Sequence, residues 1–363
     1  MVWTPPTGIA ICQDSGVFNG EVVMNGRFII GIDLAKNVFQ LHGMASDGSV
    51  AFRKKLSRAK LLPFIAEHPT CLVAMEACAG AHHWGREIGK LGHDVRLIAP
   101  QYVKPFVKRQ KNDAADAEAI AEAASRPTMR FVGVKTHRQQ SQAMAFKTRD
   151  LLMAQRTQTI NALRGHFAEY GIVVPTGPQN IRQLAAVLHE PEPDLPEAVV
   201  ELGRELLKHL QMLNERIQTQ DEVVRKSAQS DETARRLMKV PGIGPITAAA
   251  MVALSPDTST FSKGRDFAAW LGLTPKQNST GGKTRLGKMS KMGQRDLRRL
   301  LIIGAMAVVR HTAKQVSEKE SWLGRMLARK PKMLVAVALA NKIARVAWAL
   351  MARGGVYESP ATV

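Results

Sequence analysis

The sequence predicts an α/β domain, then a pair of long, coiled-coil-like helices, then an all-α C-terminal domain. Three observations carry this prediction. Apolar, β-branched runs alternate with helical stretches up to about residue 134. Two long helical patterns follow, separated by a Pro/Gly-rich break at 171–177. From residue 237 onward, short apolar helices are joined by glycine-containing turns, and 363 residues suffice for two or three such cores.

The α/β domain, residues 27–137, is expected to contain a mixed sheet. Its first three strands are separated by short turns and predict an antiparallel meander. The later strands alternate with helices and predict parallel pairing. The expected strands are Arg27–Asp33, Asn37–Gly43, Ser49–Arg53, Thr70–Met75 and Asp94–Ala99, and the expected helices are Ser57–Glu67, His82–Leu91 and Asn112–Ser125.

Residues 138–235 predict two long helices, Gln139–Tyr170 and Glu197–Ser230, whose apolar positions recur at three- and four-residue steps. They are interpreted as an antiparallel arm that joins copies of the chain, with an ordinary helical subdomain as the alternative. Residues 236–353 form the C-terminal domain, with helices at Thr247–Leu254, Asp266–Leu271, Leu297–Val309, Trp322–Ala328 and Met333–Met351. Residues 1–26 are expected to be a disordered leader and 354–363 a tail.

Charge and cysteine content limit the classes of partner and the cellular compartment that fit this chain. There are 51 Lys and Arg against 31 Asp and Glu, a formal charge of +20, which favours nucleic acid as the partner. A ribosomal or merely solubilising surface is the alternative. Three cysteines without metal-site spacing argue against a disulfide framework and fit a reducing cytoplasm. No run of about 18 uncharged apolar residues predicts a membrane span, because Asn341, Lys342 and Arg345 interrupt the best candidate.

Four carboxylates stand at the boundaries of the predicted elements: Asp33, Glu76, Asp113 and Asp116. The first two close buried strands, and the last two lie three residues apart on one face of a helix. Converging carboxylates would bind Mg²⁺, or Mn²⁺, and so assist phosphodiester chemistry. The alternative is four unrelated surface acids, with Asp113 as a helix cap.

Three groups of residues are candidate nucleic-acid contacts. Lys104, Lys108, Arg109 and Lys111 precede Asp113 and suit a phosphate backbone, or else form a solvated face. Gly242 and Gly244 lie in a turn, VPGIGPITA, that resembles the hairpin of helix-hairpin-helix proteins, with a structural turn as the alternative. The third group surrounds Ser279 and comprises Lys276, Lys283, Arg285, Lys288, Lys291, Arg295, Arg298 and Arg299.

Ser279 lies in the segment NSTGGKTR, and the eight basic residues just named are accompanied by one acid, Asp296. A hydroxyl among cations can act as a nucleophile on phosphorus, because the cations stabilise the developing charge. The same segment is also typical of a mobile loop. From these residues alone, both interpretations remain open.

Taken together, these elements resemble the DEDD transposases of bacterial insertion sequences. The most similar stretches are GIDLAKNVFQLHG, AMEACAGAHHW, KNDAADAEAIAEAA, VPGIGPITAAAMVA and AAWLGLTPKQNSTGGKTRLGKMSKMGQRDLRRLL, and the resemblance extends from about Phe28 to Arg353. It implies a RuvC-like, RNase H-fold N-terminal domain whose acid tetrad is Asp33, Glu76, Asp113 and Asp116. It further implies a catalytic serine at Ser279, with Thr280, Thr284 and Ser290 as neighbouring hydroxyls.

The resemblance also implies partners. Such enzymes recombine donor and target DNA under the direction of a non-coding bridge RNA, with Mg²⁺ at the acids and a covalent serine–DNA intermediate. A dimer or tetramer in the bacterial cytoplasm, associated with the nucleoid, is the expected active form. Two rival interpretations are a Holliday-junction-type endonuclease that uses water, and a nucleic-acid-binding scaffold without activity.

Overall fold

The computed structural model describes residues 28–107, 113–190, 194–313 and 321–358, except for the side chain of Asp113. The predicted leader and the candidate contacts Lys108, Arg109 and Lys111 lie outside these residues. The chain divides into two compact units, one of residues 1–139 with 256–262 and one of residues 140–255 with 263–363. The finer division at residues 235 and 353 stays a prediction.

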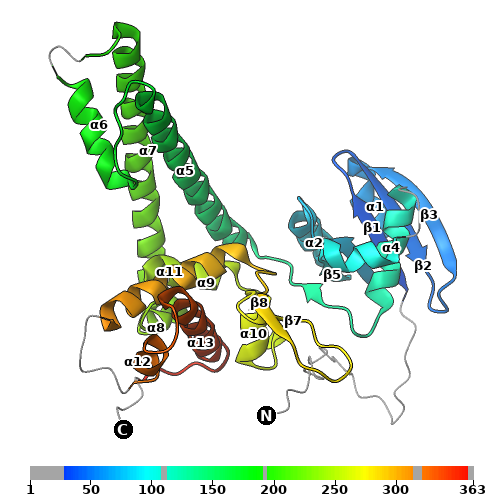
Figure 1. Cartoon of the computed structure of the whole chain (residues 1–363). Helices are drawn as coiled ribbons and strands as arrows, with labels where there is room; N and C mark the ends of the chain where they lie inside the picture. The colour runs from blue at the N-terminus through cyan, green and yellow to red at the C-terminus, as the bar shows by residue number, and fades with distance from the viewer. Residues whose placement is uncertain (1–27, 108–112, 191–193, 314–320, 359–363) are drawn as a thin grey trace. The chain divides into compact units, whose positions relative to one another are not determined.

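The first unit is built on a six-stranded mixed sheet with the order β3-β2-β1-β4-β5-β6 (Figure 1). β1 pairs antiparallel with β2 and parallel with β4, so it lies at the centre of the sheet. This confirms the predicted meander followed by parallel strands. The bounds are β1 Ile29–Leu34, β2 Val38–Met44, β3 Val50–Ser57, β4 Leu72–Glu76, β5 Asp94–Ile98 and β6 Phe131–Val132.

Helices cover both faces of this sheet. Alternate side chains of β1 and β4 enter two separate cores, as the period of a strand requires. Ile30, Ile32 and Val73 pack with α1 and α2, whereas Ile29 and Leu72 pack with α4. The helices are η1 Arg58–Lys60, α1 Leu61–Ala66, α2 Ala81–Lys90, α3 Pro100–Val103, η2 Lys104–Phe106 and α4 Asp113–Ser125. The short elements α3, η2 and β6 were not predicted from the sequence.

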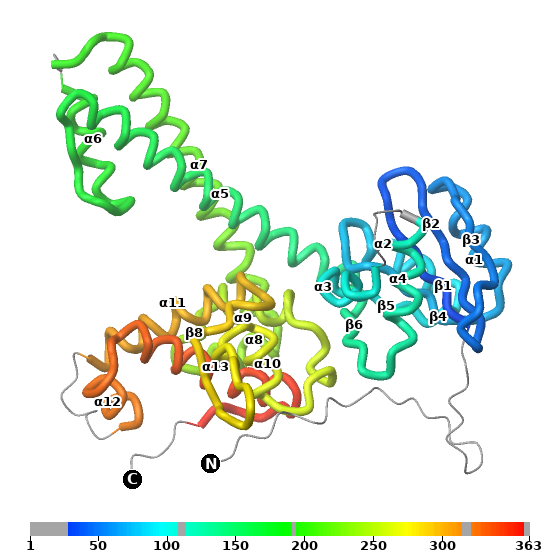
Figure 2. Tube along the Cα trace, turned by 45° about the vertical axis from the view of Figure 1, so that its right-hand side comes forward, coloured from blue at the N-terminus to red at the C-terminus, as the bar shows by residue number. Residues whose placement is uncertain are grey.

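Two long antiparallel helices lie in the second unit, α5 His137–Ala168 from its fourth residue onward and α7 Glu197–Ser230, with α6 Ile181–Leu188 beside one end (Figure 2). The two long helices run antiparallel, because residues later in α5 contact residues earlier in α7. Arg149 forms an ion pair with Asp221, and Arg156 donates to Asn214 over 3.4 Å. The predicted pair of long helices is therefore present, while its use in oligomerisation stays a prediction.

The remaining helices of this unit form one packed group: α8 Glu232–Leu237, α9 Pro245–Leu254, α10 Gly264–Trp270, α11 Arg295–Thr312, α12 Trp322–Leu327 and α13 Lys332–Arg353. By length and composition, α13 is apolar enough to cross a membrane. It packs instead against α8, α10 and α11 and buries Val335, Ala340 and Ile343. As the sequence predicts, α13 is a core helix.

The prediction of an all-α C-terminal domain is wrong in one place. β7 Pro275–Gln277 and β8 Leu286–Met289 form an antiparallel hairpin. Gly281 and Gly282 have φ angles of +53° and +74°, values typical of the tight turn that joins two strands. Both strands are largely exposed, so no apolar alternation marks them in the sequence. The Gly-Gly pair was the available signal, and it was interpreted as a mobile loop.

Candidate active site

Asp33 and Glu76 lie level with each other at the same edge of the sheet. The parallel register pairs Ile32 of β1 with Met75 of β4, and the two acids are the next residues along each strand. Because side chains alternate between the two faces along a strand, Asp33 and Glu76 lie on the face of the sheet that packs against α4. The sequence prediction that two strand ends bring these acids together agrees with this register.

Gly31 allows α4 to lie directly on β1. A Cβ atom at Gly31 would lie 2.7 Å from the backbone nitrogen of Ala121, and closer still to the carbonyl oxygen of Ala117. The helix backbone can approach this closely only because residue 31 has no side chain. Asp116 directly precedes Ala117, so this contact brings Asp116 to the edge occupied by Asp33 and Glu76.

The electrostatics of this edge agree with its geometry. Partial burial and the neighbouring charge of Asp116 raise the pKa of Glu76 above its usual value. The pKa of the Cys78 thiol is raised by burial, and further by Glu76 and Asp33. Asp33, Glu76 and Asp116 therefore all influence the region around Glu76 and Cys78.

This region suits a divalent cation by its chemistry, because carboxylate oxygens are the ligands that Mg²⁺ and Mn²⁺ prefer. Glu76 and Asp116 repel one another, and a cation would relieve that repulsion. Within the described part of the chain, no group of three or more His, Cys, Asp or Glu side chains is arranged to hold a metal ion. Asp113, the fourth acid, belongs to the first turn of α4, and its side chain lies outside that part.

We expect Glu76→Gln to stabilise the metal-free protein near neutral pH. The folded state favours the protonated form of Glu76, so stability is lost as pH rises from the ordinary carboxyl pKa to the raised pKa of Glu76. Below the ordinary carboxyl pKa the side chain is neutral in both the folded and the unfolded state, and the difference from wild type should vanish. Thermal unfolding in EDTA from about pH 3 to pH 8 measures the effect.

Glu87→Gln is the matched control for that experiment. Glu87 lies on α2, and hydrogen bonding to Lys90 lowers its pKa, the opposite direction from Glu76. Removing its charge should therefore give no gain in stability at pH 7 to 8. If Glu76→Gln behaved like Glu87→Gln, the crowding between Glu76 and Asp116 would be refuted.

Two other acids of α4 are engaged away from this edge. Glu118 pairs with Arg53 at 2.9 Å, and Glu122 pairs with Arg126 at 2.6 Å. Lys104, a candidate phosphate contact, is exposed on η2. Glu118 and Glu122 are therefore engaged in ion pairs, and the metal-binding role of Asp113 and Asp116 on the same helix stays a prediction.

Ser279 lies in the β7–β8 hairpin, exposed, between β7 and the Gly281–Gly282 turn. Its hydroxyl oxygen accepts two hydrogen bonds, one from the side-chain amide of Gln277 at 3.1 Å and one from the backbone N–H of Arg285 at 3.3 Å. The sequence analysis missed Gln277. Its spacing of two residues from Ser279 places both on one side of a strand, which was the available signal.

The base of this hairpin is fixed to the end of α10. The backbone N–H of Ser290 donates to the carbonyl of Thr274 at 2.8 Å. Arg298 is buried, and its Nη1 donates to the carbonyls of Leu271 and Met292 at 2.9 and 3.1 Å. Burial lowers the pKa of Arg298. We therefore correct its assignment: Arg298 holds the hairpin in place and does not face a phosphate.

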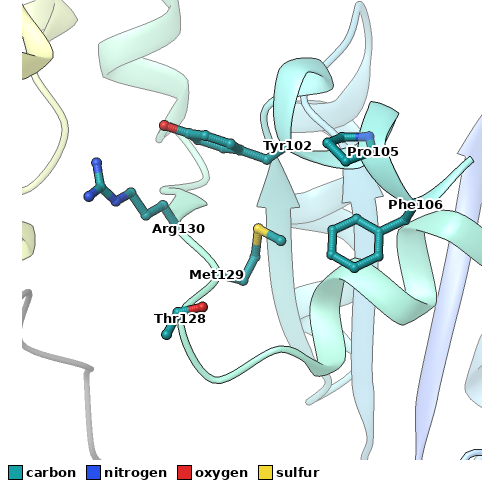
Figure 3. A pocket seen from close by; sticks show the side chains of 6 residues that line it. All are labelled: Tyr102, Pro105, Phe106, Thr128, Met129 and Arg130. Carbon is teal, nitrogen blue, oxygen red and sulfur yellow. The ribbon is translucent and has the colours of Figure 1, made fainter. Parts of the chain in front are cut away.

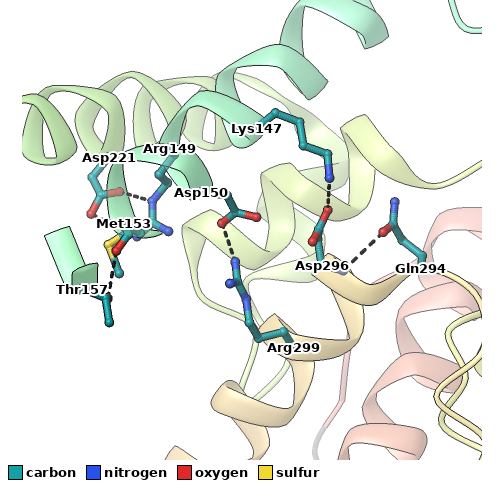
Figure 4. A network of polar contacts seen from close by, with 9 residues as sticks. All are labelled: Lys147, Arg149, Asp150, Met153, Thr157, Asp221, Gln294, Asp296 and Arg299. Carbon is teal, nitrogen blue, oxygen red and sulfur yellow. Dashed lines mark hydrogen bonds and ion pairs between the residues drawn. The ribbon is translucent and has the colours of Figure 1, made fainter. Parts of the chain in front are cut away.

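Ion pairs connect α11, which follows the hairpin, to α5 (Figure 4). Arg299 pairs with Asp150, and Asp296 pairs with Lys147 at 2.6 Å. Arg299 is thus paired within the protein although its side chain is exposed, and Arg298 is buried. The other six basic residues of this segment are exposed: Lys276, Lys283, Arg285, Lys288, Lys291 and Arg295.

The two glycines of the α8–α9 turn have different surroundings. Gly242 has a φ of +91° and packs on α11, where an added Cβ would lie 3.2 Å from the carbonyl of Gly304. Gly244 is exposed with nothing near its Cβ position, and it precedes the first turn of α9. The turn thus has the packing role offered as the alternative. A phosphate contact at Gly244 stays a prediction.

Comparisons with known proteins agree on one family. Residues 30–172 match the model of a transposase domain of the DEDD type, and residues 234–320 match the "Transposase IS116/IS110/IS902 family". A "Probable family 20 transposase" of Pseudomonas aeruginosa is 48% identical over 91% of this chain and 98% of its own length. The "Transposase for insertion sequence element IS1328" of Yersinia enterocolitica is 43% identical, with the same two coverages. That for IS1111A of Coxiella burnetii is 39% identical over 91% of both chains.

Proposed function

Because this chain belongs to the IS116/IS110/IS902 family of transposases, which cleave and rejoin DNA, we propose that it does so with an acid site and a serine nucleophile. The observation that supports this most is the arrangement of Asp33, Glu76 and Asp116 at one sheet edge. The two hydrogen-bond donors on Ser279 support the second part.

The DEDD transposase domain implies a divalent metal requirement. We assign its ligands to Asp33, Glu76, Asp113 and Asp116, with Mg²⁺ as the metal and Mn²⁺ as the alternative. When bound, such a cation neutralises charge on a phosphodiester and activates it toward attack. Through the bound cation, the carboxylates would orient the DNA strand. The exposed Lys104 lies on the same unit and would contact phosphates of that DNA strand.

Ser279 would attack the phosphorus of the scissile phosphodiester. The bond from Oγ to phosphorus forms while the bond from phosphorus to the leaving oxygen of the strand breaks, and the proton lost by the serine hydroxyl balances the proton that the leaving oxygen takes up. Attack by a free strand hydroxyl on the serine ester then rejoins the DNA. The donors at Gln277 and Arg285 stabilise negative charge on Oγ in both steps, when it attacks and when it leaves.

Guidance by a bridge RNA and assembly into a dimer or tetramer belong to the same proposal. Six exposed cations around Ser279 suit nucleic-acid backbone. Met144, Leu151 and Leu202 are exposed on the two long helices, as apolar positions facing a second copy would be. Sequencing the RNA that co-purifies with the chain, expressed with its flanking DNA in the cytoplasm of a bacterium, tests the guidance.

The competing activity is a structure-specific endonuclease that uses water. The acids Asp33, Glu76 and Asp116 would serve both activities, whereas a serine nucleophile is needed only for covalent transfer, and the two donors on Ser279 suit that role. A non-enzymatic scaffold would need neither group. The serine is therefore the residue that distinguishes these functions.

We expect Ser279→Ala to reduce strand exchange by at least about a thousandfold, because the substitution removes the oxygen that would attack phosphorus. A denaturing gel with labelled element-end DNA measures the covalent protein–DNA adduct, which should be absent in Ser279→Ala. Thr280→Ala is the matched control, and it should retain both the adduct and strand exchange. Full cleavage by Ser279→Ala would establish the water-using endonuclease instead.

A further inference from the structure

A pocket of about 430 Å³ opens beside α4 in the first unit, close to the end of β5 (Figure 3). It is lined by Tyr102, Pro105, Phe106, Thr128, Met129 and Arg130. The first three come from α3 and η2, and the last three from the segment between α4 and β6. Its volume falls within the roughly 300–1,000 Å³ typical of ligand sites.

The pocket combines flat apolar surfaces with a cationic rim. Figure 3 shows the rings of Tyr102 and Phe106 and the thioether of Met129 around the opening, with Arg130 at one side. Arg126 lies over the Phe106 ring at 5.6 Å from its centroid. Aromatic rings with neighbouring cations bind a nucleotide well, because the base stacks on a ring and the phosphate meets a cation.

The pocket lies close to the edge of the sheet that carries Asp33, Glu76 and Asp116, which is called the acid edge. Tyr102, Phe106 and Met129 pack at the margin of the core formed by α4, which is the face of the sheet that carries the candidate acids. Phe131 pairs with Ile98, and Ile98 pairs with Glu76. Two strand spacings therefore separate Phe131 from Glu76, a distance on the order of 10 Å, and Met129 lies two residues before Phe131.

We propose that this pocket receives an unpaired nucleotide of the DNA strand next to the cleavage point. The base would lie against Tyr102 and Phe106, with its phosphate on Arg130 or Lys104. DNA is favoured over RNA because the pocket shares a unit and a sheet face with the acids that act on DNA. The inference depends on the proposed acid site for its location, but binding itself needs neither metal nor serine.

The test is DNA binding by the full chain in EDTA. Element-end duplexes would carry one unpaired 2-aminopurine at successive positions around the cut, and stacking quenches its fluorescence. At one position, wild type should bind and quench. Tyr102→Leu should bind that duplex about tenfold more weakly, as expected for loss of one stacked base, while Tyr102→Phe should bind like wild type.

An abasic duplex with the same phosphates separates stacking from general affinity. Wild type should bind it as weakly as Tyr102→Leu binds the 2-aminopurine duplex, and Tyr102→Leu should lose nothing further. Arg130→Ala, at an exposed position, should weaken both duplexes. Tyr170→Leu, at a half-exposed ring of the other unit, should weaken neither.

Three results would overturn the proposal: no quenching at any position, equal losses by Tyr102→Leu on both duplexes, or a loss confined to an RNA version of the strand. The last result would assign the pocket to the guide. Because these measurements use no catalysis, they can fail while Ser279 chemistry holds. Equally, they can succeed if that chemistry is wrong.

Discussion

Asp33→Asn is expected to reduce DNA cleavage by about a hundredfold or more while leaving DNA binding nearly unchanged. The substitution keeps the size of the side chain at the end of β1 and removes one negative charge from the acid edge. Binding depends mainly on the surplus of basic residues, which it does not alter. Parallel cleavage and mobility-shift assays across a Mg²⁺ titration measure both effects.

Asp94→Asn is the control for this prediction. Asp94 begins β5, at the opposite edge of the sheet from Glu76, and pairs with Arg96 at 2.9 Å. The Asp94→Asn substitution also removes one negative charge from the first unit, and it should leave DNA cleavage intact. Excision and rejoining at the wild-type rate by Asp33→Asn would exclude the acid edge as the catalytic site.

Gly31→Ala is expected to damage the same site without touching a carboxylate. The new Cβ would press on backbone atoms of α4, which cannot rotate away as a side chain can. Overpacking of this kind costs about 1–3 kcal/mol of stability. A displacement of α4 by about 1 Å would also move Asp116, and misplacement on that scale can reduce catalysis about a hundredfold. Thermal unfolding, cleavage rates and hydrogen exchange in peptides of α4 report these effects.

Gly89→Ala gives the comparison. Gly89 lies on α2 of the same unit, and nothing lies within 4 Å of its Cβ position. Since alanine is the better helix former, this substitution should be neutral or stabilise by up to about 1 kcal/mol. Equal behaviour of the two variants would mean that α4 does not rest on Gly31.

The positions of Asp33 and Glu76 at strand ends could be predicted, while their role as metal ligands stays a prediction. A charged residue that ends a buried strand is costly without a partner, so Asp33 and Glu76 stand out in the sequence. Strand order then follows from the alternation of elements. The bounds of α7 could also be predicted, because its apolar spacing is regular over 34 residues. Other helices differ from the predicted bounds, as α5 and α11 do by two to three residues at each end.

Contacts between distant segments could not be predicted in this way. In the sequence, Gly31 indicates only an interruption of a strand. The structure shows that the backbone of Ala117 and Ala121 packs against it. Arg298 reads as one more cation in a basic run, and only the fold reveals the two carbonyls that it binds. The hairpin around Ser279 lacks an apolar face, so periodicity gave no sign of its strands.

The internal engagement of Arg298 and Arg299 changes how this segment should respond to salt. Eight basic residues lie between Lys276 and Arg299, but two of them are bound to carbonyls and to Asp150. Duplex DNA held by the remaining six would release about five counterions rather than about seven. The affinity of the serine-bearing segment for duplex DNA should thus fall less steeply with ionic strength than its composition suggests.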